Sequence, residues 1–240
     1  MYGSFVVKFK NLGDRLEIPF PSIYFKEFFL DNIKELSSCF KVNILKTRIN
    51  NIEIETEEAF FLRISYFEEE AFIKLSQELF KYKLLKLPFF QFEILSFVSK
   101  NKWNEKFDDI NIEDQLILDF YTPYVAKFGD NFVTEFNAYL FLNSIYKEEN
   151  IDNKFNLKKI SNKIKIETLE LFEKRVNFDA NFGFGIKCII KLDFSDLSYY
   201  DKEFIKNLIK IGYYKGSGYR KDLGYGMYLV KEFEDEYSNT

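Results

Sequence analysis

The residues best suited to chemistry lie near the C-terminus, where five of the chain's ten glycines fall between Gly212 and Gly226. Glycine permits positive φ and lets another backbone come close, and successive amides in such a turn can form a concave nest for anionic oxygens. The predicted anion-binding residues are Lys215, Gly216, Gly218, Arg220, Lys221, Gly224 and Gly226. The alternative is a glycine-rich connection into an edge strand.

Two familiar phosphate-binding motifs do not fit this segment. Its spacing is not G-x-x-x-x-G-K-[ST], which excludes a P-loop. It also runs from a predicted helix into a predicted strand, whereas the dinucleotide-binding fingerprint runs from a strand into a helix.

A second basic run precedes it, formed by Lys154, Lys158, Lys159, Lys163 and Lys165. Lys163 and Lys165 alternate with Ile164 and Ile166, as on a strand with one charged face. These two lysines are candidate RNA contacts. The alternative is an exposed loop and an edge strand that lysines protect from pairing.

The charge of the chain is unevenly distributed. The net charge is −4, yet residues 154–231 carry 16 basic and 9 acidic side chains, a net of +7. The remainder carries 18 basic and 29 acidic side chains, a net of −11. A polyanion-binding site on one side of the protein would produce this uneven distribution. The alternative is a solvated surface on which the charges are unevenly distributed by chance.

Composition narrows the class of protein. A hydrophobic share of 47% and a charged share of 30% are typical of a globular protein. The 30 Phe residues could stack on bases, but most are expected in the core. With no histidine, and with Cys39 and Cys188 far apart, no metal or cofactor site is expected. No signal peptide or apolar stretch of roughly 20 residues is apparent, so we expect a cytoplasmic protein with free thiols.

The N-terminal half, residues 1–98, shows a regular order of elements. Phe5, Val7 and Phe9 alternate as in a half-buried strand, and Ser22 can cap a helix. Further strands are predicted over residues 40–46 and 59–66, a helix over residues 69–82, and a closing strand around Phe90, Phe92 and Ile94. This β-α-β-β-α-β order is that of the ferredoxin-like unit.

The same order recurs after a polar linker, residues 99–114. The second half, residues 115–240, has predicted strands over residues 116–120, 164–172, 185–194 and 226–230, with helices over residues 134–146 and 200–211. We therefore predict an α+β protein of two tandem ferredoxin-like halves packed side by side.

One motif carries a family resemblance. Ile211-Gly212-Tyr213, followed by G-x-G-x-[RK]-x-x-x-G-[FY]-G-M, resembles the C-terminal glycine-rich loop of the CRISPR-associated endoribonucleases that process repeat RNA, members of the RAMP superfamily. Further similar stretches are Ile18-Pro19-Phe20, residues 118–124 with their Thr-Pro step, Phe128-Gly129, and residues 184–187.

The resemblance implies binding of CRISPR repeat RNA and cleavage without a metal. In the family, a 2′-hydroxyl attacks the adjacent phosphate and leaves a 2′,3′-cyclic phosphate. Many members place a histidine near the end of the first helix, where this chain has residues 34–39 and no histidine. The catalytic candidates are then Tyr24, Lys41 and Lys46. Losing general acid-base help slows cleavage roughly 10²- to 10⁴-fold without abolishing it.

Two other functions compete with this interpretation. A related RAMP subunit could bind RNA within a CRISPR effector complex without cutting it, which the missing histidine favours. A ferredoxin-like module for a small ligand or a protein would have no role with RNA. Repeat RNA is the expected partner. The sequence leaves open whether other effector subunits or a second copy of the chain join it.

Overall fold

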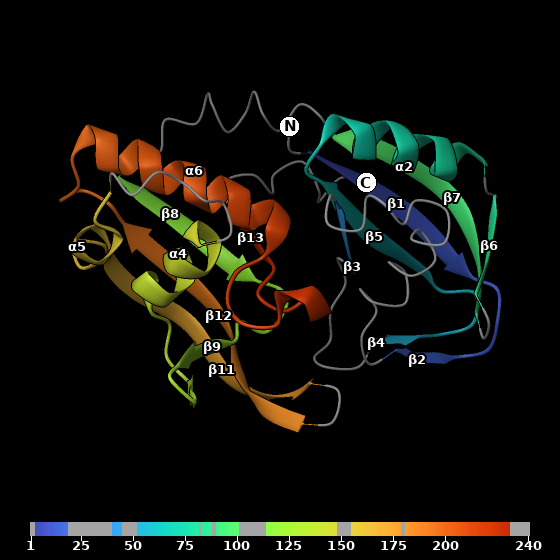
Figure 1. The fold of residues 1–240 in the computed structure, drawn as a ribbon. Coiled ribbons are helices and arrows are strands. Elements are labelled where there is room, and N and C mark those ends of the chain that lie inside the picture. Colours follow the sequence, from blue (N-terminus) through green and yellow to red (C-terminus); the bar gives the residue numbers. More distant parts are fainter. Residues whose placement is uncertain are drawn as a thin grey trace. The chain divides into compact units, whose positions relative to one another are not determined.

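The computed structural model describes residues 3–18, 40–44, 52–81, 83–87, 90–100, 114–147, 155–178 and 181–230. The chain forms two compact units, one mainly from residues up to 108 and the other mainly from residues beyond. Both are mixed α+β structures with antiparallel sheets (Figure 1). The helix expected from Ser22 and residues 101–113 of the expected linker lie outside the described residues, whereas residues 99 and 100 are strand.

The first unit is built on a five-stranded sheet in the order β3-β5-β1-β7-β6. Its strands are β1 (Gly3–Asn11), β3 (Phe40–Ile44), β5 (Ala59–Tyr66), β6 (Leu84–Leu87) and β7 (Phe90–Lys100). The predicted alternation is confirmed in β1, where Phe5, Val7 and Phe9 are buried. Helix α2 (Glu69–Lys81) adds Leu75 and Leu79 to the same core.

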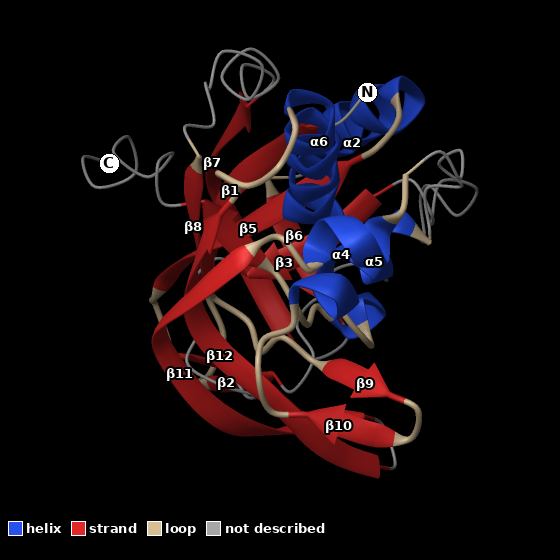
Figure 2. Ribbon diagram, turned by 90° about the vertical axis from the view of Figure 1, so that its left-hand side faces the viewer, coloured by secondary structure: helices blue, strands red, loops and turns tan. Residues whose placement is uncertain are grey.

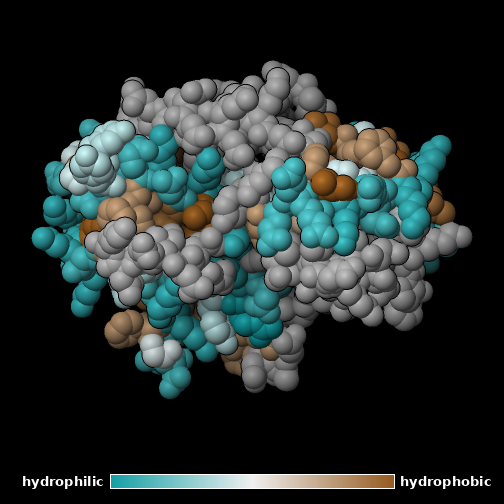
Figure 3. Space-filling model, turned by 45° about the horizontal axis from the view of Figure 1, so that its top comes forward, coloured by the Kyte–Doolittle hydropathy of each residue, from teal (hydrophilic) through white to brown (hydrophobic). Residues whose placement is uncertain are grey.

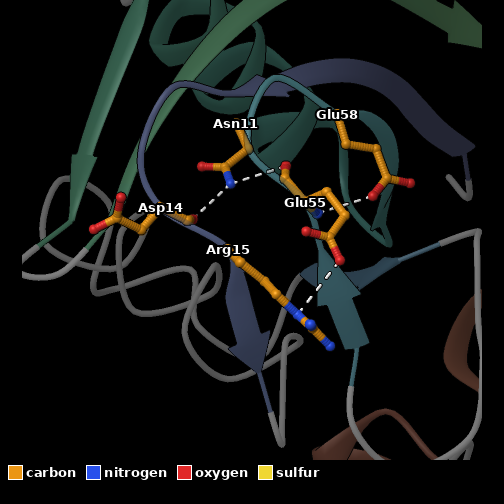
Figure 4. A network of polar contacts seen from close by, with 5 residues as sticks. All are labelled: Asn11, Asp14, Arg15, Glu55 and Glu58. Carbon is orange, nitrogen blue, oxygen red and sulfur yellow. Dashed lines mark hydrogen bonds and ion pairs between the residues drawn. The ribbon is translucent and has the colours of Figure 1, made fainter.

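A small two-stranded sheet, β2 (Leu16–Ile18) with β4 (Ile52–Ile54), extends this unit. The buried Asn11 amide organises the chain beside it, donating to the carbonyl oxygens of Asp14 at 2.9 Å and Glu55 at 3.1 Å (Figure 4). The Glu55 carboxylate forms an ion pair with the Arg15 guanidinium at 3.4 Å, and the Glu55 backbone amide donates to the Glu58 carboxylate at 2.9 Å. One asparagine thus joins the turn after β1 to the turn before β5.

The second unit contains a four-stranded antiparallel sheet in the order β11-β12-β8-β13. Its strands are β8 (Gln115–Phe120), β11 (Lys165–Phe178), β12 (Asn181–Asp193) and β13 (Tyr228–Val230). Helices α4 (Ala138–Tyr146), α5 (Leu157–Ser161) and α6 (Tyr199–Lys215) lie on one side of it (Figure 2). A short hairpin, β9 (Ala126–Phe128) with β10 (Asn131–Val133), completes the unit.

The core of the second unit also holds polar atoms. Cys188 is a free thiol on β12, and its burial together with the nearby Asp119 raises its pKa to about 12. Burial likewise raises the pKa of the Tyr124 hydroxyl.

Apolar and hydrophilic side chains are interspersed over the described part of the surface in Figure 3. In the described ranges, no helix is both long and apolar enough to span a bilayer.

Several predicted boundaries are wrong. Helix α4 begins at Ala138 and not at residue 134, because the Asn137 side chain accepts from the Leu140 amide at 3.0 Å and residues 131–133 form β10. Helix α6 continues to Lys215, so the first residues of the expected loop are helical. The strands β11 and β12 are also longer than predicted.

Candidate functional site

The glycine-rich segment, which belongs to the second unit except for residues 222–224, runs from the end of α6 into β13, as predicted from its position between a helix and a strand. Gly216 ends the helix with a φ of +76°, and its amide donates to the Gly212 carbonyl oxygen at 2.7 Å. Gly218, Gly224 and Gly226 also have positive φ, of +88°, +90° and +71°. Glycine is the residue that adopts this backbone region without strain.

Several amides of this segment, including those of Gly218 and Gly226, are engaged within the protein. Three backbone amides donate to carbonyl oxygens elsewhere in the second unit: Ser217 to Gly226, Tyr219 to Val125, and Gly226 to Pro123. Two more donate to hydroxyl oxygens, Gly218 to Ser144 and Met227 to Thr122. The distances are 2.7 to 3.0 Å. These amides therefore cannot form the predicted nest while the loop keeps this conformation.

The glycines have a packing role instead. A Cβ at Gly226 would lie 1.7 Å from the Ser217 carbonyl oxygen, and a Cβ at Gly218 would lie 2.3 Å from the Val125 carbonyl oxygen. Real Cβ atoms do not approach so closely, so the loop must move if either glycine gains a side chain. The glycines hold the loop tightly against β13 and the chain around Val125.

The two adjacent cations in the loop have different environments. The Lys221 side chain is 8% exposed, and its ammonium donates to the Ser144 carbonyl oxygen at 3.0 Å. It begins the 3₁₀ helix η2 (Lys221–Leu223). Arg220 is half-buried, has a φ of +54°, and places its guanidinium 5.9 Å from the centre of the Phe178 ring. Lys221 therefore anchors the loop to α4, and Arg220 is the better placed of the two to meet a ligand.

A further cation, Lys127, joins this site and was missed from the sequence. Its ammonium lies 4.5 Å from the ring centre of Tyr219, in the loop, and 4.7 Å from that of Phe132 on β10. Such contacts fix a cation in place while leaving its charge unneutralised. The sequence gives little indication of this role, because Lys127 and Tyr219 are far apart in the chain and meet only in the folded structure.

The aromatic residues under these cations form one cluster. Phe132 stacks on Phe178 with ring centres 5.7 Å apart, and Tyr219 meets Phe178 edge-on at 5.7 Å. A Cβ at Gly183 would lie 2.3 Å from Phe132, so glycine on β12 makes room for that ring. The site consists of Arg220 and Lys127 on this aromatic cluster, and we call it the loop site.

The second basic run is only partly described. Lys158 and Lys159 are exposed on α5, a helix that the sequence did not predict, and Lys163 is exposed in the turn that follows. Lys165 starts β11, an edge strand of the sheet as its lysines suggested. It pairs with Asp196 at 3.0 Å, a hydrogen bond that raises the pKa of the lysine. The charge of Lys165 is therefore partly neutralised by Asp196.

Of the three predicted catalytic residues, the structure describes one, Lys41. Tyr24 and Lys46 fall outside the described residues. Lys41 lies on β3 in the first unit, opposite Ser65 of β5. Over the described part of the chain, no three carboxylate or thiol side chains gather as they would around a metal ion.

No protein-family model and no curated protein matches the chain, whereas solved structures do. A product complex of Cas6 from Thermus thermophilus matches with a TM-score of 0.73 and 15% identity, over 96% of this chain and 100% of the other. The product of a Cas6-related gene from Pyrococcus furiosus matches with a TM-score of 0.63 and 18% identity, over 96% and 98%.

A RAMP protein described as binding different RNA substrates matches with a TM-score of 0.58 and 16% identity, over 95% of this chain and 99% of the other. These likenesses extend through nearly the whole chain, far beyond the motif in residues 211–227. The chain therefore has the fold of Cas6 and RAMP proteins, which confirms at the level of the fold the resemblance drawn from that motif.

Proposed function

We propose that this protein binds CRISPR repeat RNA in the cytoplasm and cleaves it to produce guide RNAs. The observation that carries the proposal is the Cas6 fold over nearly the whole chain, together with the cationic loop site where the glycine-rich motif lies. Arg220 and Lys127 are suited to phosphates because an RNA backbone supplies closely spaced negative charge. Lys163, Lys165 and Lys215 are further proposed RNA contacts. Lys163 and Lys165 lie just before and at the start of β11, at the opposite end of that strand from Phe178 of the loop site.

We further infer that each unit is a ferredoxin-like half, as the sequence predicts. In the second unit the elements follow the order β8-α4-β11-β12-α6-β13, with the β9–β10 hairpin and α5 inserted, and the sheet order is β11-β12-β8-β13. In the first unit, β3-β5-β1-β7 follows the same scheme, with β6 added at the edge. The boundary at residues 99–114 and the side-by-side packing of the halves remain predictions.

The proposed reaction uses the RNA as its own nucleophile. The 2′-hydroxyl beside the scissile phosphate attacks phosphorus, the bond to the 5′-oxygen breaks, and a 2′,3′-cyclic phosphate remains. Tyr24, Lys41 and Lys46 would stabilise the developing charge on the phosphate and assist proton transfer. A lysine or tyrosine can hold a phosphate in its ordinary protonation state, but either needs a large pKa shift to act as a base.

A second function has one observation in its favour. The chain contains no histidine, so the side chain that most readily transfers protons near neutral pH is absent. A RAMP subunit that binds RNA without cutting it, within a larger CRISPR complex, would not need one. Binding tests do not separate the two functions, whereas a cleavage assay does.

Binding is tested by removing the charge of the loop site. Replacing both Arg220 and Lys127 with Gln should weaken binding of repeat RNA and reduce the slope of log K against log salt by roughly 1 to 2, about one for each lost phosphate contact. The matched control is Gln at Lys81 and Lys83, which are exposed at the end of α2 and just after it. Equal effects of the two double variants in a filter-binding assay would show that the loop site has no specific part in binding.

A further inference from the structure

An apolar row on β12 continues past the covered core of the second unit. Phe182, Phe184, Ile186, Cys188, Ile190 and Leu192 alternate on one face of the strand. The last four are buried, but Phe182 is 55% exposed and Phe184 is 38% exposed. The end of the β11–β12 hairpin extends beyond the helices that cover the rest of the sheet (Figures 1 and 2). Two aromatic rings therefore stand on an open surface.

An arginine of the neighbouring strand completes this surface. Arg175 is opposite Phe184 in the ladder, so its side chain leaves the sheet on the same face, diagonal to Phe182. Its guanidinium lies 4.0 Å from the centre of the Phe182 ring, a distance that places it against the face of the ring. The rings of Phe182 and Phe184 meet edge-on, with centres 6.5 Å apart.

We propose that Arg175, Phe182 and Phe184 form a stacking platform for unpaired nucleotides of the RNA. This inference rests on the proposed function and concerns a surface on the opposite face of the hairpin from Phe178 and Gly183 of the loop site. Exposed aromatic rings and arginine planes are the groups on which single-stranded bases stack, whatever their sequence.

The size and charge of the surface favour nucleotides over a protein partner. Two half-exposed Phe rings offer roughly 200 Å² of apolar surface, whereas a stable protein interface buries about 800 Å² on each side. One base covers about the area of one ring. Arg175 adds a positive charge for the adjoining phosphate. Glu173, a carboxylate on the same face, lies on the side of Arg175 that leads back toward the covered core.

The test compares two oligonucleotides of equal length and charge, an oligouridylate and the same ribose-phosphate chain without bases. The wild-type protein should bind the oligouridylate about tenfold more tightly, because stacking supplies roughly 1–3 kcal/mol per base. Phe182→Ala and Phe184→Ala should each remove most of this preference, and Arg175→Lys, which keeps the charge but loses the plane, should reduce it. Phe172→Ala is the matched control, since Phe172 is 54% exposed on the opposite face of the same hairpin.

Repeat RNA titrated in parallel separates this inference from the proposed function. If the wild type binds repeat RNA but does not distinguish the two oligonucleotides, the platform is disproved and the proposed function stands. The same holds if Phe172→Ala weakens the preference as much as Phe182→Ala, or if the wild type associates with itself through this face and Phe182→Ala abolishes the association. If the wild type binds neither repeat RNA nor oligonucleotide, both proposals fail. Thermal unfolding of each variant verifies that its fold is retained.

Discussion

At the scale of single residues, the loop site depends on glycines that make close packing possible. Gly226 has a φ of +71° and lies against the Ser217 carbonyl oxygen, whereas Gly129 has a φ of +61° with nothing within 4 Å of the position of a Cβ. The two positions share the backbone requirement and differ in space, so they can be compared directly.

Gly226→Ala should lower the free energy of unfolding by about 2–4 kcal/mol, the sum of a left-handed backbone and an overpacked contact. Gly129→Ala should cost about 1–2 kcal/mol, the backbone contribution alone. Urea denaturation of both variants measures the difference. Equal costs would mean that Ser217 can move aside at little expense, and that the loop is not held as tightly as its contacts imply.

Substitutions at the neighbouring cations Arg220 and Lys221 should have different effects, on RNA binding at Arg220 and on stability at Lys221. Arg220→Gly removes a charge and relieves a φ of +54° that non-glycine residues rarely adopt. The relief of about 1–2 kcal/mol is offset by the greater flexibility of unfolded glycine, about 0.5–1 kcal/mol. We expect little change in stability but weaker RNA binding with a shallower salt dependence, measured by filter binding at several salt concentrations.

Lys221→Met provides the contrasting case, because it keeps an apolar stem and removes the hydrogen bond to the Ser144 carbonyl oxygen. Leaving that acceptor unpaired should cost about 1–3 kcal/mol of stability. Thermal unfolding together with RNA binding distinguishes the two residues. If Lys221→Met retained full stability and lost binding, Lys221 would be an RNA contact, as the sequence suggested.

At the scale of elements, segments with a regular apolar pattern were predictable, whereas four of the three-residue strands were not. Strand β5 has the predicted bounds, residues 59–66, and α2 was predicted to within one residue of its described end. Each has several apolar residues at one period, which is the strongest signal that a sequence carries. Strands β2, β4, β9 and β10 have three residues each, too few to show any period.

The candidate site was predictable in its position but not in its contacts. The glycine spacing identified the loop, because positive φ is a local property that the residue type reveals. That the Lys221 ammonium would be bound by α4, or that Lys127 would lie over Tyr219, depends on contacts between segments far apart in the chain. The sequence does not show which of two neighbouring cationic residues is buried. In this loop, burial distinguishes Lys221, which holds the loop to α4, from Arg220, which is more exposed.

Helix α4 begins at the cap residue Asn137, whose side chain accepts a hydrogen bond from the Leu140 amide. Asn137→Ala removes the acceptor for the Leu140 amide and should cost about 1 kcal/mol of stability. Asn137→Asp keeps an oxygen in the same place and should cost little. Because Ser144 near the end of α4 holds both Gly218 and Lys221, loosening this helix should also weaken RNA binding. Urea denaturation tests the first effect, and a loss of stability equal for Ala and Asp would contradict the cap.

At the scale of the whole molecule, a net charge of −4 does not prevent RNA binding. Charges separated by more than about 10 Å are largely screened at 0.1 M salt. In the proposed RNA binding, the charges within this distance of the RNA therefore matter most, and residues 154–231, which supply Arg220, carry a net charge of +7. Local cations determine affinity, and the total charge matters mainly for solubility.

Cleavage is the property of the whole chain that decides between the two RNA functions. Incubated with a cognate repeat in EDTA, the protein should cut at one phosphate and leave a 2′,3′-cyclic phosphate, because the proposed nucleophile belongs to the RNA. A single 2′-deoxy substitution at the cut should stop the reaction without weakening binding. Without histidine, the single-turnover rate should be roughly 10²- to 10⁴-fold below that of an enzyme with full acid-base help.

The residues proposed to replace histidine are tested in the same assay. Tyr24→Ala, Lys41→Ala and Lys46→Ala should each lower the rate, with binding retained in at least one of them, because a group that acts on the developing charge contributes to the transition state more than to the bound RNA. A requirement for magnesium would overturn the mechanism. Tight binding by the wild type with no cut at any phosphate would assign the chain to the subunits that carry RNA without cleaving it, and the loop site and the stacking platform would then serve binding alone.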